Sequence, residues 1–509
     1  MSLSHYVYRG AAFLWGIAAL VVFTVRSYLD DRPPSSGSDS EQKRLLRDAQ
    51  HRTWSLEDEA ISGLHHDFLT LSSGLQLHYV SNGERKAAGN LVIFLHGFPD
   101  SWYIFSRFLS SPGLHATGAQ LVALDLPGFG GSDDLGHYGP DEMLNTVSEA
   151  IVQLKAQYLI LDDRSRCLLV GHDWGGLLSY RIAAETLGLV HRLVVVNIGY
   201  AGQMPVVGRN ARLAIRTCQS HLTAWIRDPL KANLALSAWQ SVAPLVTQML
   251  MSSYIFMFNL PYAILTIMPL RTLEYLLDWC HREGHHRHKV ASKPGHVSEL
   301  FLAESRASSF GPGSAECTSR DHKNSTYSAA VLSRATTSPP GNWLQRIRLY
   351  REGLTSGKWT LAPELQRYRP APEGEGETFK CPVTVLFGLQ DPALDPRVVL
   401  DGVERYFTGA TKVATGDGSH EKQGTSTASD AGASHIVRLY GCGHWSLLED
   451  PIGSGTLEKT LVCLLSETNG ADSGSLEEVL ARRAQHDDLA NRVTIVTHTK
   501  ENFMPYRAT

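Results

Sequence analysis

The sequence has few cysteines for its length and no excess of charge of either sign. Seven cysteines are scattered over 509 residues and form no CxxC pair, which argues against a disulfide framework or a zinc site and favours a reducing compartment. Lysine and arginine number 47 and aspartate and glutamate 51, a formal net charge of −4, so no nucleic-acid partner is expected. With 43% hydrophobic residues, the chain can bury a sizeable core.

An uncharged apolar run lies near the N-terminus, from Gly10 to Val25, between Arg9 and Arg26. A helix of this length falls slightly short of a hydrocarbon core of about 30 Å, but flanking tyrosines can extend its reach at the interfaces. We expect residues 1–30 to form a retained single-pass membrane anchor. A cleaved signal peptide and a buried helix are the alternatives. More basic residues follow the run than precede it, which predicts a cytosolic body. We expect the membrane to be that of the endoplasmic reticulum.

Short apolar runs alternate with amphipathic segments in the body of the chain. The runs are rich in Val, Leu and Ile and do not alternate with polar residues, which is typical of strands buried on both faces of a parallel sheet. The stretch from Glu142 to Gln157 has helical spacing between two of them. This order predicts a doubly wound, mostly parallel α/β sheet. The runs are Leu91–Leu95, Leu121–Leu124, Cys167–Val170, Leu193–Val196, Val383–Phe387 and Ile436–Leu439.

The spacing of these runs predicts the domain organisation. Residues 31–63 read as a linker and a polar helical segment, and 64–199 and 381–465 as two parts of one core. The long insertion at 200–380 is expected to be a helical lid with a loose stretch at 303–340. A second insertion at 411–434 is expected to be disordered, and 466–509 to be a tail. The His-rich tract at 281–288 reads as a solvated loop, with metal binding as the less favoured alternative.

One motif stands out in the first part of the core, Gly171-His172-Asp173-Trp174-Gly175-Gly176. It follows an expected strand and precedes an expected helix, which matches a nucleophile elbow, G-x-Nu-x-G. Glycines permit the sharp turn that this elbow requires. The middle residue is an aspartate rather than a serine. The alternative is an ordinary tight turn in which Asp173 caps a helix.

Three further elements follow expected strands. Asp391 comes after Val383–Phe387, and His444 after Ile436–Leu439, while His96-Gly97-Phe98-Pro99 follows Leu91–Leu95. Because the carboxyl ends of parallel strands meet at one edge of the sheet, these residues should lie near Asp173. Their order along the chain is nucleophile, acid, histidine, as in α/β-hydrolase triads. Individually, His444 could be a core histidine and Asp391 a turn residue.

These motifs resemble the epoxide-hydrolase branch of the α/β-hydrolases. The matching pieces span roughly Leu64 to Ile452, strongly in the core and weakly in the lid. They are HGFPDSW at His96–Trp102, DLPGFGGSD at Asp125–Asp133, GHDWGG at Gly171–Gly176 and GCGHW at Gly441–Trp445.

The resemblance implies an α/β-hydrolase fold with an inserted helical lid, and a role for each site residue. It implies that Asp173 is the nucleophile, His444 the base and Asp391 the residue that orients it. The backbone amides of Phe98 and Trp174 would form the oxyanion hole. No metal or organic cofactor is implied.

Members of that branch also present two lid tyrosines to the substrate oxygen. Tyr254 is similar to the first of these tyrosine motifs. The second usually reads Asn-Trp-Tyr, whereas Leu344 follows Asn-Trp here. This departure puts the second proton donor in doubt, with Tyr350 and Tyr327 as candidates.

The expected reaction is hydrolysis of a small lipophilic epoxide to a vicinal diol through an ester on Asp173. A haloalkane dehalogenase shares the aspartyl ester but requires N–H donors for halide. Phe98 stands where that family often has an asparagine, which favours the epoxide, while Leu344 weakens the preference. A non-catalytic, membrane-tethered binding protein is the remaining alternative. An apolar lid together with the anchor is compatible with a substrate drawn from the membrane.

Overall fold

The computed structural model describes residues 3–30, 40–57, 61, 63–83, 89–159, 165–284, 298–321, 323–337, 342–370, 378–407, 432–468, 475–487, 489 and 491–498. The expected linker at 31–39, the latter half of the His-rich tract and nearly all of the second insertion lie outside these residues.

Nine strands of the described chain form one sheet in the order β1-β2-β4-β3-β5-β6-β7-β8-β9. The pairs from β4 through β8 are parallel, whereas β1, β2 and β9 pair antiparallel at the two edges. The expected mostly parallel sheet is therefore confirmed. The strands are β1 His65–Thr70, β2 Gln76–Ser81, β3 Asn90–Leu95, β4 Gln120–Leu124, β5 Arg166–His172, β6 Arg192–Val196, β7 Val383–Gly388, β8 Ser434–Leu439 and β9 Val493–His498.

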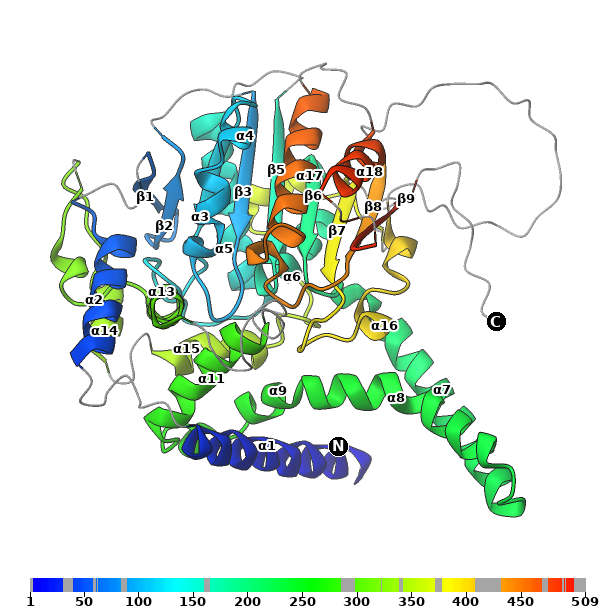
Figure 1. The fold of residues 1–509 in the computed structure, drawn as a ribbon. Coiled ribbons are helices and arrows are strands. Elements are labelled where there is room, and N and C mark those ends of the chain that lie inside the picture. Colours follow the sequence, from blue (N-terminus) through cyan, green and yellow to red (C-terminus); the bar gives the residue numbers. More distant parts are fainter. Residues whose placement is uncertain are drawn as a thin grey trace, which may run out of the picture.

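Helices cover both faces of the sheet (Figure 1). Successive residues of the central strand β3 point to opposite faces, so that Ile93 packs in one core and Phe94 in the other. The first core includes α5 and α6, and the second includes η1, α3, α4, α17 and α18. The core helices are η1 Trp102–Phe105, α3 Ser106–Leu109, α4 Pro112–His115, α5 Pro140–Tyr158, α6 Trp174–Glu185, α16 Pro396–Val399, η7 Val403–Tyr406, η9 Ser446–Leu448, α17 Gly453–Thr468 and α18 Leu476–His486.

The insertion between β6 and β7 is helical and lies below the carboxyl ends of the parallel strands in the view of Figure 1. Two long helices, α7 and α8, form a hairpin, and the shorter α9 continues from α8. The helices are η2 Ala201–Gln203, α7 Met204–Arg227, α8 Ala232–Met251, α9 Ser253–Phe258, α10 Tyr262–Leu265, α11 Leu270–Gly284, α13 Glu299–Phe310, η3 Glu316–Thr318, α14 Ala329–Thr336, α15 Trp343–Arg346, η4 Ile347–Tyr350 and η5 Pro363–Tyr368.

Two segments differ from the sequence-based expectation. Residues 303–337, expected to be loose, contain ordered helices because small side chains permit close packing. Ala303 and Ala307 of α13 contact Ala49 of α2 (Ser40–Trp54), and the indole of Trp54 donates to the carbonyl of Ala307 at 2.9 Å. The expected C-terminal tail supplies α18 and the edge strand β9, whose buried Val493 packs in the second core.

Helix α1, Leu3–Leu29, is long and apolar enough to cross a membrane. It lies along the lid, where it packs against α9 and α11 (Figure 1). Its outer side is exposed.

Candidate active site

Asp173 lies at a sharp turn between β5 and α6. Its backbone has φ 49° and ψ −122°, a conformation that an L-residue adopts only when the surrounding structure enforces it. Gly171 allows the turn to close, because a Cβ atom there would lie 2.5 Å from the Cα of Gly176. Asp173 occupies the N-cap position of α6, yet its side chain makes no capping hydrogen bond. The carboxylate points instead toward the carboxyl ends of the neighbouring strands.

Two backbone amides lie beside the Asp173 carboxylate. The amide of Phe98, just beyond β3, donates to Oδ1 at 2.9 Å, and the amide of Trp174, the next residue, helps to lower the pKa of the carboxyl group. Burial opposes ionisation, but His444, His172 and the backbone amide of Trp174 lower the pKa of Asp173 overall. The carboxylate is therefore ionised at neutral pH. The two amides that the sequence analysis assigned to an oxyanion hole do lie beside the nucleophile candidate.

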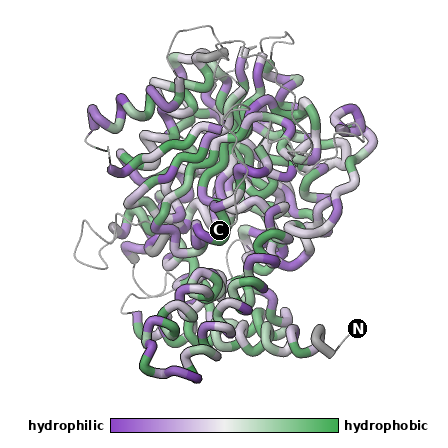
Figure 2. The backbone as a smooth tube through the Cα atoms, turned by 90° about the vertical axis from the view of Figure 1, so that its right-hand side faces the viewer, coloured by the Kyte–Doolittle hydropathy of each residue, from purple (hydrophilic) through white to green (hydrophobic). Residues whose placement is uncertain are grey.

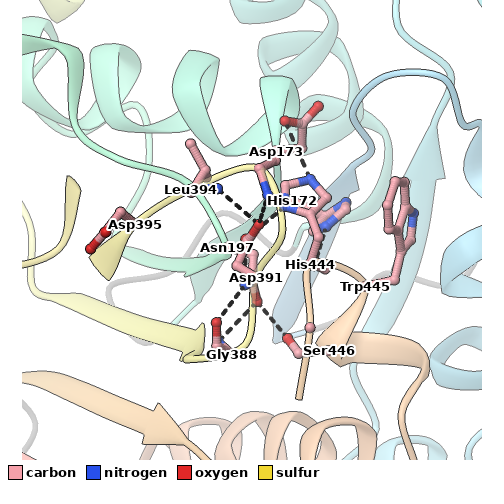
Figure 3. Close-up of polar contacts among 12 residues, drawn as sticks. His172, Asp173, Asn197, Gly388, Asp391, Leu394, Asp395, His444, Trp445 and Ser446 are labelled. Carbon is pink, nitrogen blue, oxygen red and sulfur yellow. Dashed lines mark hydrogen bonds and ion pairs between the residues drawn. The ribbon is translucent and has the colours of Figure 1, made fainter. Parts of the chain in front are cut away.

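His444 lies between two carboxylates (Figure 3). Its Nδ1 is 2.7 Å from Oδ2 of Asp391, and its Nε2 is 3.6 Å from Oδ2 of Asp173. Burial disfavours the imidazolium, but the two carboxylates outweigh it and raise the pKa of His444 to about 10. The structure thus brings together the three side chains that the sequence placed at separate strand ends.

The Asp391 carboxylate is fixed on both of its oxygens. Oδ1 accepts from the backbone amides of Ala393 and Leu394 at 2.8 and 3.0 Å, and Oδ2 accepts from Nδ2 of Asn197 at 2.9 Å. Asn197 follows β6 directly, in a left-handed conformation with φ 48°, and its Oδ1 accepts from the Ser446 hydroxyl. Asn197 was not predicted from the sequence, although a polar residue directly after the buried run 193–196 was a usable signal.

Two lid tyrosines stand over the carboxylate. Tyr254 of α9 and Tyr350 of η4 line the same cavity as Asp173 and His444, about 30 Å³ in volume. Their rings are 6.0 Å apart, and Tyr350 packs edge-on against Trp174. Burial raises the pKa of both phenols well above the ordinary value, so both are protonated. Tyr327 lies elsewhere, with its hydroxyl donating to the carbonyl of Trp54.

A second buried group, which was not predicted from the sequence, adjoins the site. Asp100 accepts from the Trp445 indole at 2.7 Å and lies 3.5 Å from Nε2 of His281 on α11. Burial raises the pKa of Asp100 to about 7 and lowers that of His281 to about 3. Within the described residues, neither Oδ1 of Asp100 nor Nδ1 of His281 has a hydrogen-bond partner. A buried carboxyl group with a raised pKa therefore lies beside Trp445.

No group of three or more His, Cys, Asp or Glu side chains among the described residues has the arrangement of a metal site. Of the His-rich tract, the structure describes only the first four residues, which form the end of α11.

Comparison with known proteins agrees with this geometry. A family model described as the alpha/beta hydrolase fold matches residues 90–234. Epoxide hydrolase 3 of Xenopus tropicalis is 37% identical over 125 residues, which are 25% of this chain and 31% of the relative. Over this segment the chain has the alpha/beta hydrolase fold and is similar to epoxide hydrolases. Epoxide hydrolase 4 of Homo sapiens is 33% identical over 151 residues, 29% of this chain and 38% of that relative.

The matched segment of this α/β-hydrolase spans about a third of the length of these curated relatives. A solved Cif epoxide hydrolase from Acinetobacter nosocomialis also matches, with a TM-score of 0.45 and 13% identity over 86% of this chain and 99% of that one. The fold assignment depends on the sheet order and the family match, which place the elbow, the acid and the histidine at one edge of the sheet.

Proposed function

We propose that this α/β-hydrolase converts an epoxide to a vicinal diol through a covalent ester on Asp173. One observation carries the proposal. An ionised carboxylate lies at the nucleophile elbow, 2.9 Å from a backbone amide and 3.6 Å from an imidazole that a second carboxylate orients. A carboxylate needs no base to become nucleophilic, and it attacks saturated carbon readily when the leaving oxygen can be protonated.

The first step forms the ester. A carboxylate oxygen of Asp173 bonds to an epoxide carbon, the C–O bond of that carbon breaks, and the electron pair stays on the epoxide oxygen. Tyr254 or Tyr350 donates the proton that this oxygen needs, since both residues line the cavity beside Asp173. The products are a hydroxyalkyl ester of Asp173 and a tyrosinate.

Ester formation changes the charge around His444. The negative charge of Asp173 is one of the interactions that raise the pKa of His444 to about 10, and the ester removes it. The imidazolium can then pass its proton to the tyrosinate. His444 becomes the neutral base only after the nucleophile has reacted, which keeps the two steps in order.

The second step hydrolyses the ester. Neutral His444 takes a proton from water, whose oxygen attacks the carbonyl carbon of the ester. The amides of Phe98 and Trp174 stabilise the tetrahedral oxyanion, each by ~3 kcal/mol. The imidazolium protonates the leaving alcohol, and the acid form of Asp173 then returns its proton to His444. Epoxide and water are consumed, diol is released, and the starting charges are restored.

The two tyrosines favour an epoxide over a haloalkane as substrate. A departing halide needs N–H donors and no proton, whereas a departing alkoxide must be protonated. Tyr254 and Tyr350 are protonated O–H donors on the lid side of Asp173. Phe98, which offers its backbone amide but no side-chain N–H, supports the same preference.

The proposal includes attachment to a membrane through α1 and a lipophilic substrate. The sequence favours a cytosolic body, and α1 is long and apolar enough to cross a membrane and has several exposed apolar residues. The cavity of about 30 Å³ has room for little more than water, so a substrate would enter when side chains of the lid such as Trp279 move.

The decisive experiment traps the ester. In the full chain with His444→Gln, attack by Asp173 remains possible but water is not activated. Incubation with styrene oxide should add the mass of one substrate to the peptide that contains Asp173, and Asp173→Ala should remove both adduct and diol formation.

The matched control is His115→Gln, at a histidine of α4 outside the site, which should turn over normally. If His444→Gln forms no adduct while diol is still released, the two-step scheme is wrong. Halide release from a haloalkane without diol formation would assign the dehalogenase reaction instead.

A further inference from the structure

The α7–α8 hairpin projects from the lid without a core of its own (Figure 1). Both helices are described throughout. None of the 24 residues of α7 is buried, and only Ala238 is buried among the 20 residues of α8. The two helices pack against each other along one side each. Long helices with so little buried surface normally need a partner for their apolar residues.

Helix α7 is a basic amphipathic helix. At 100° per residue, four of its five exposed large apolar residues form a stripe within about 40° around the axis, and the fifth, Leu213, lies on the opposite side. The stripe consists of Met204, Ile215, Leu222 and Ile226. The helix contains no acidic residue, and its arginines occupy the face next to the stripe. The arginines are Arg209, Arg212, Arg216 and Arg227. This pairing of an apolar stripe with cations is typical of helices that lie in the headgroup region of a membrane.

Helix α8 and the tip of the hairpin extend the apolar surface. The 20 residues of α8 include no charged side chain, and Leu236, Trp239 and Leu250 are exposed on one side of it. Leu230 at the tip is 95% exposed. A tryptophan and a leucine exposed beside arginines suit the boundary between headgroups and acyl chains.

Helix α1 is attached to the lid over most of its length. Gly16 lies so close to α9 that a Cβ atom there would be 2.5 Å from the carbonyl oxygen of Phe256. Phe23 packs edge-on against Trp279 of α11 at 5.4 Å. Near its end, Arg271 donates to the carbonyls of Ser27 and Asp30 at 2.6 and 2.7 Å.

These contacts are incompatible with a helix that crosses the bilayer alone. If α1 spanned the membrane with its lid contacts intact, α11 would follow it into the hydrocarbon. Helix α11 carries Arg271, Glu274, Asp278 and Arg282, and charged side chains are costly there. A helix in the plane of the membrane keeps every contact with the lid. Its outer side remains free to enter the lipid with Leu14, Val21, Val25 and Leu29, all exposed.

We propose that the outer face of the lid, formed by α1 and the α7–α8 hairpin, binds the surface of an anionic membrane with α1 lying in the membrane plane. Both elements lie at the same end of the molecule, beyond the lid (Figures 1 and 2), and Figure 2 shows hydrophobic residues in green along these helices. The arginines of α7, together with Arg26 of α1, meet anionic headgroups. The face therefore touches one leaflet only.

A second copy of the chain fits this face less well. Two hairpins packed through the same stripe would bring two sets of arginines together without any acidic residue of α7 between them. Anionic lipid neutralises those arginines and receives the apolar stripe at the same time.

Membrane binding through α1 would also bring lipid close to the reaction cavity. This point rests on the proposed function. Trp279 contacts Phe23 of α1 on one side and lines the cavity of Asp173 and His444 on the other. A membrane-bound α1 therefore lies one side chain away from the reaction cavity, and the substrate class is an epoxide dissolved in lipid.

The test uses Cys218 of α7, a partly exposed thiol beside the apolar stripe, as a local reporter. The full chain is labelled there with a polarity-sensitive dye, with Cys218→Ser as the background. Phosphatidylcholine vesicles that contain phosphatidylserine should shift the dye emission to the blue, and pure phosphatidylcholine should do so weakly. Insertion of α1 alone would leave the dye in water.

Matched variants separate the hairpin from the rest of the surface. Leu222→Asp with Ile226→Asp, and Arg209→Gln with Arg212→Gln and Arg216→Gln, should each weaken the vesicle titration by about tenfold or more. The control Leu187→Asp changes a leucine of the core that is 53% exposed, and it should leave the vesicle titration unchanged. Diol formation from a water-soluble epoxide should stay at the wild-type rate in all three, so a failure of the proposed function would be seen separately.

The orientation of α1 has its own readout. With Tyr6→Cys in the Cys218→Ser background, a membrane-impermeant maleimide added outside the vesicles should label residue 6, because an in-plane helix keeps it on the side of the body. Protection until detergent is added would mean that α1 spans and would overturn the proposal. An emission shift that does not respond to the hairpin variants would overturn it too. So would a shift that grows with protein concentration without lipid, which would assign the face to a second copy.

Discussion

The backbone at Gly97 lies directly against the side chain of Asp173. A Cβ atom at residue 97 would be 2.7 Å from Cγ of Asp173 and closer still to Oδ1. The same turn presents the amide of Phe98 to that carboxylate. The loop after β3 therefore lies so close to the Asp173 side chain that residue 97 has no room for a Cβ atom.

Gly97→Ala should displace the Asp173 carboxylate and reduce diol formation by about a hundredfold, because a misplaced nucleophile loses the benefit of orientation. The measurement is the single-turnover rate of ester formation in the His444→Gln background. Gly136→Ala is the control, since a Cβ atom at residue 136 meets no heavy atom within 4 Å. Equal rates for both variants would show that the close contact does not hold the carboxylate.

Asn197 should act as a positioning residue through Asp391. Asn197→Gly keeps the left-handed backbone available but removes the donor to Oδ2 of Asp391. A buried hydrogen bond to a charged group is worth about 1.5–3 kcal/mol, so hydrolysis of the ester should slow by about tenfold or more. Ester formation should change little, because Asp173 makes no bond to Asn197 in the structure. A selective loss in the first step would contradict this role.

The two lid tyrosines should share the protonation of the epoxide oxygen. Tyr254→Phe and Tyr350→Phe should each slow ester formation, and the double variant should lose about 10²-fold or more, the range of general acid catalysis. The measurement is adduct formation in the His444→Gln background. Tyr327→Phe removes a hydroxyl that bonds to the carbonyl of Trp54 instead and should react as the wild type does. An unchanged double variant would place the proton donor elsewhere.

The buried Asp100 should make stability depend on pH. Its pKa is raised from 3.8 to about 7 in the folded chain, so the folded state binds more protons than the unfolded state between those values. The free energy of unfolding therefore falls as pH rises from about 4 to about 7 and is unaffected by this group above that. Asp100→Asn removes the dependence, and its stability relative to the wild type should rise over that window by up to about 4 kcal/mol.

Urea unfolding of both proteins at pH 5 and pH 8 measures this difference. The opposite sign, a variant that loses relative stability at the higher pH, would mean that the Trp445 indole and His281 stabilise the charged form of Asp100 more than burial opposes it.

The sequence located the parallel strands of the sheet and the residues at their ends because those signals are local. Each central strand is a short run of Val, Leu and Ile, and Asp173, Asp391 and His444 each lie a few residues beyond the end of such a run. The edge strands β1, β2 and β9 were missed because they mix polar with apolar residues and depend on pairing partners far along the chain. Residues 303–337 looked loose for the same reason, since their order comes from packing on α2.

Sequence alone determined that an aspartate stands at the elbow and that a histidine and a second carboxylate follow later strands, since backbone pattern and spacing along the chain are sufficient for both. Only the tertiary structure decided that Tyr350 rather than Tyr327 faces the carboxylate, that Asn197 holds Asp391, that Asp100 meets His281, and that α1 lies along the lid. These relationships join residues far apart in the chain, and their distances depend on how the lid folds back over the sheet, which no local pattern encodes.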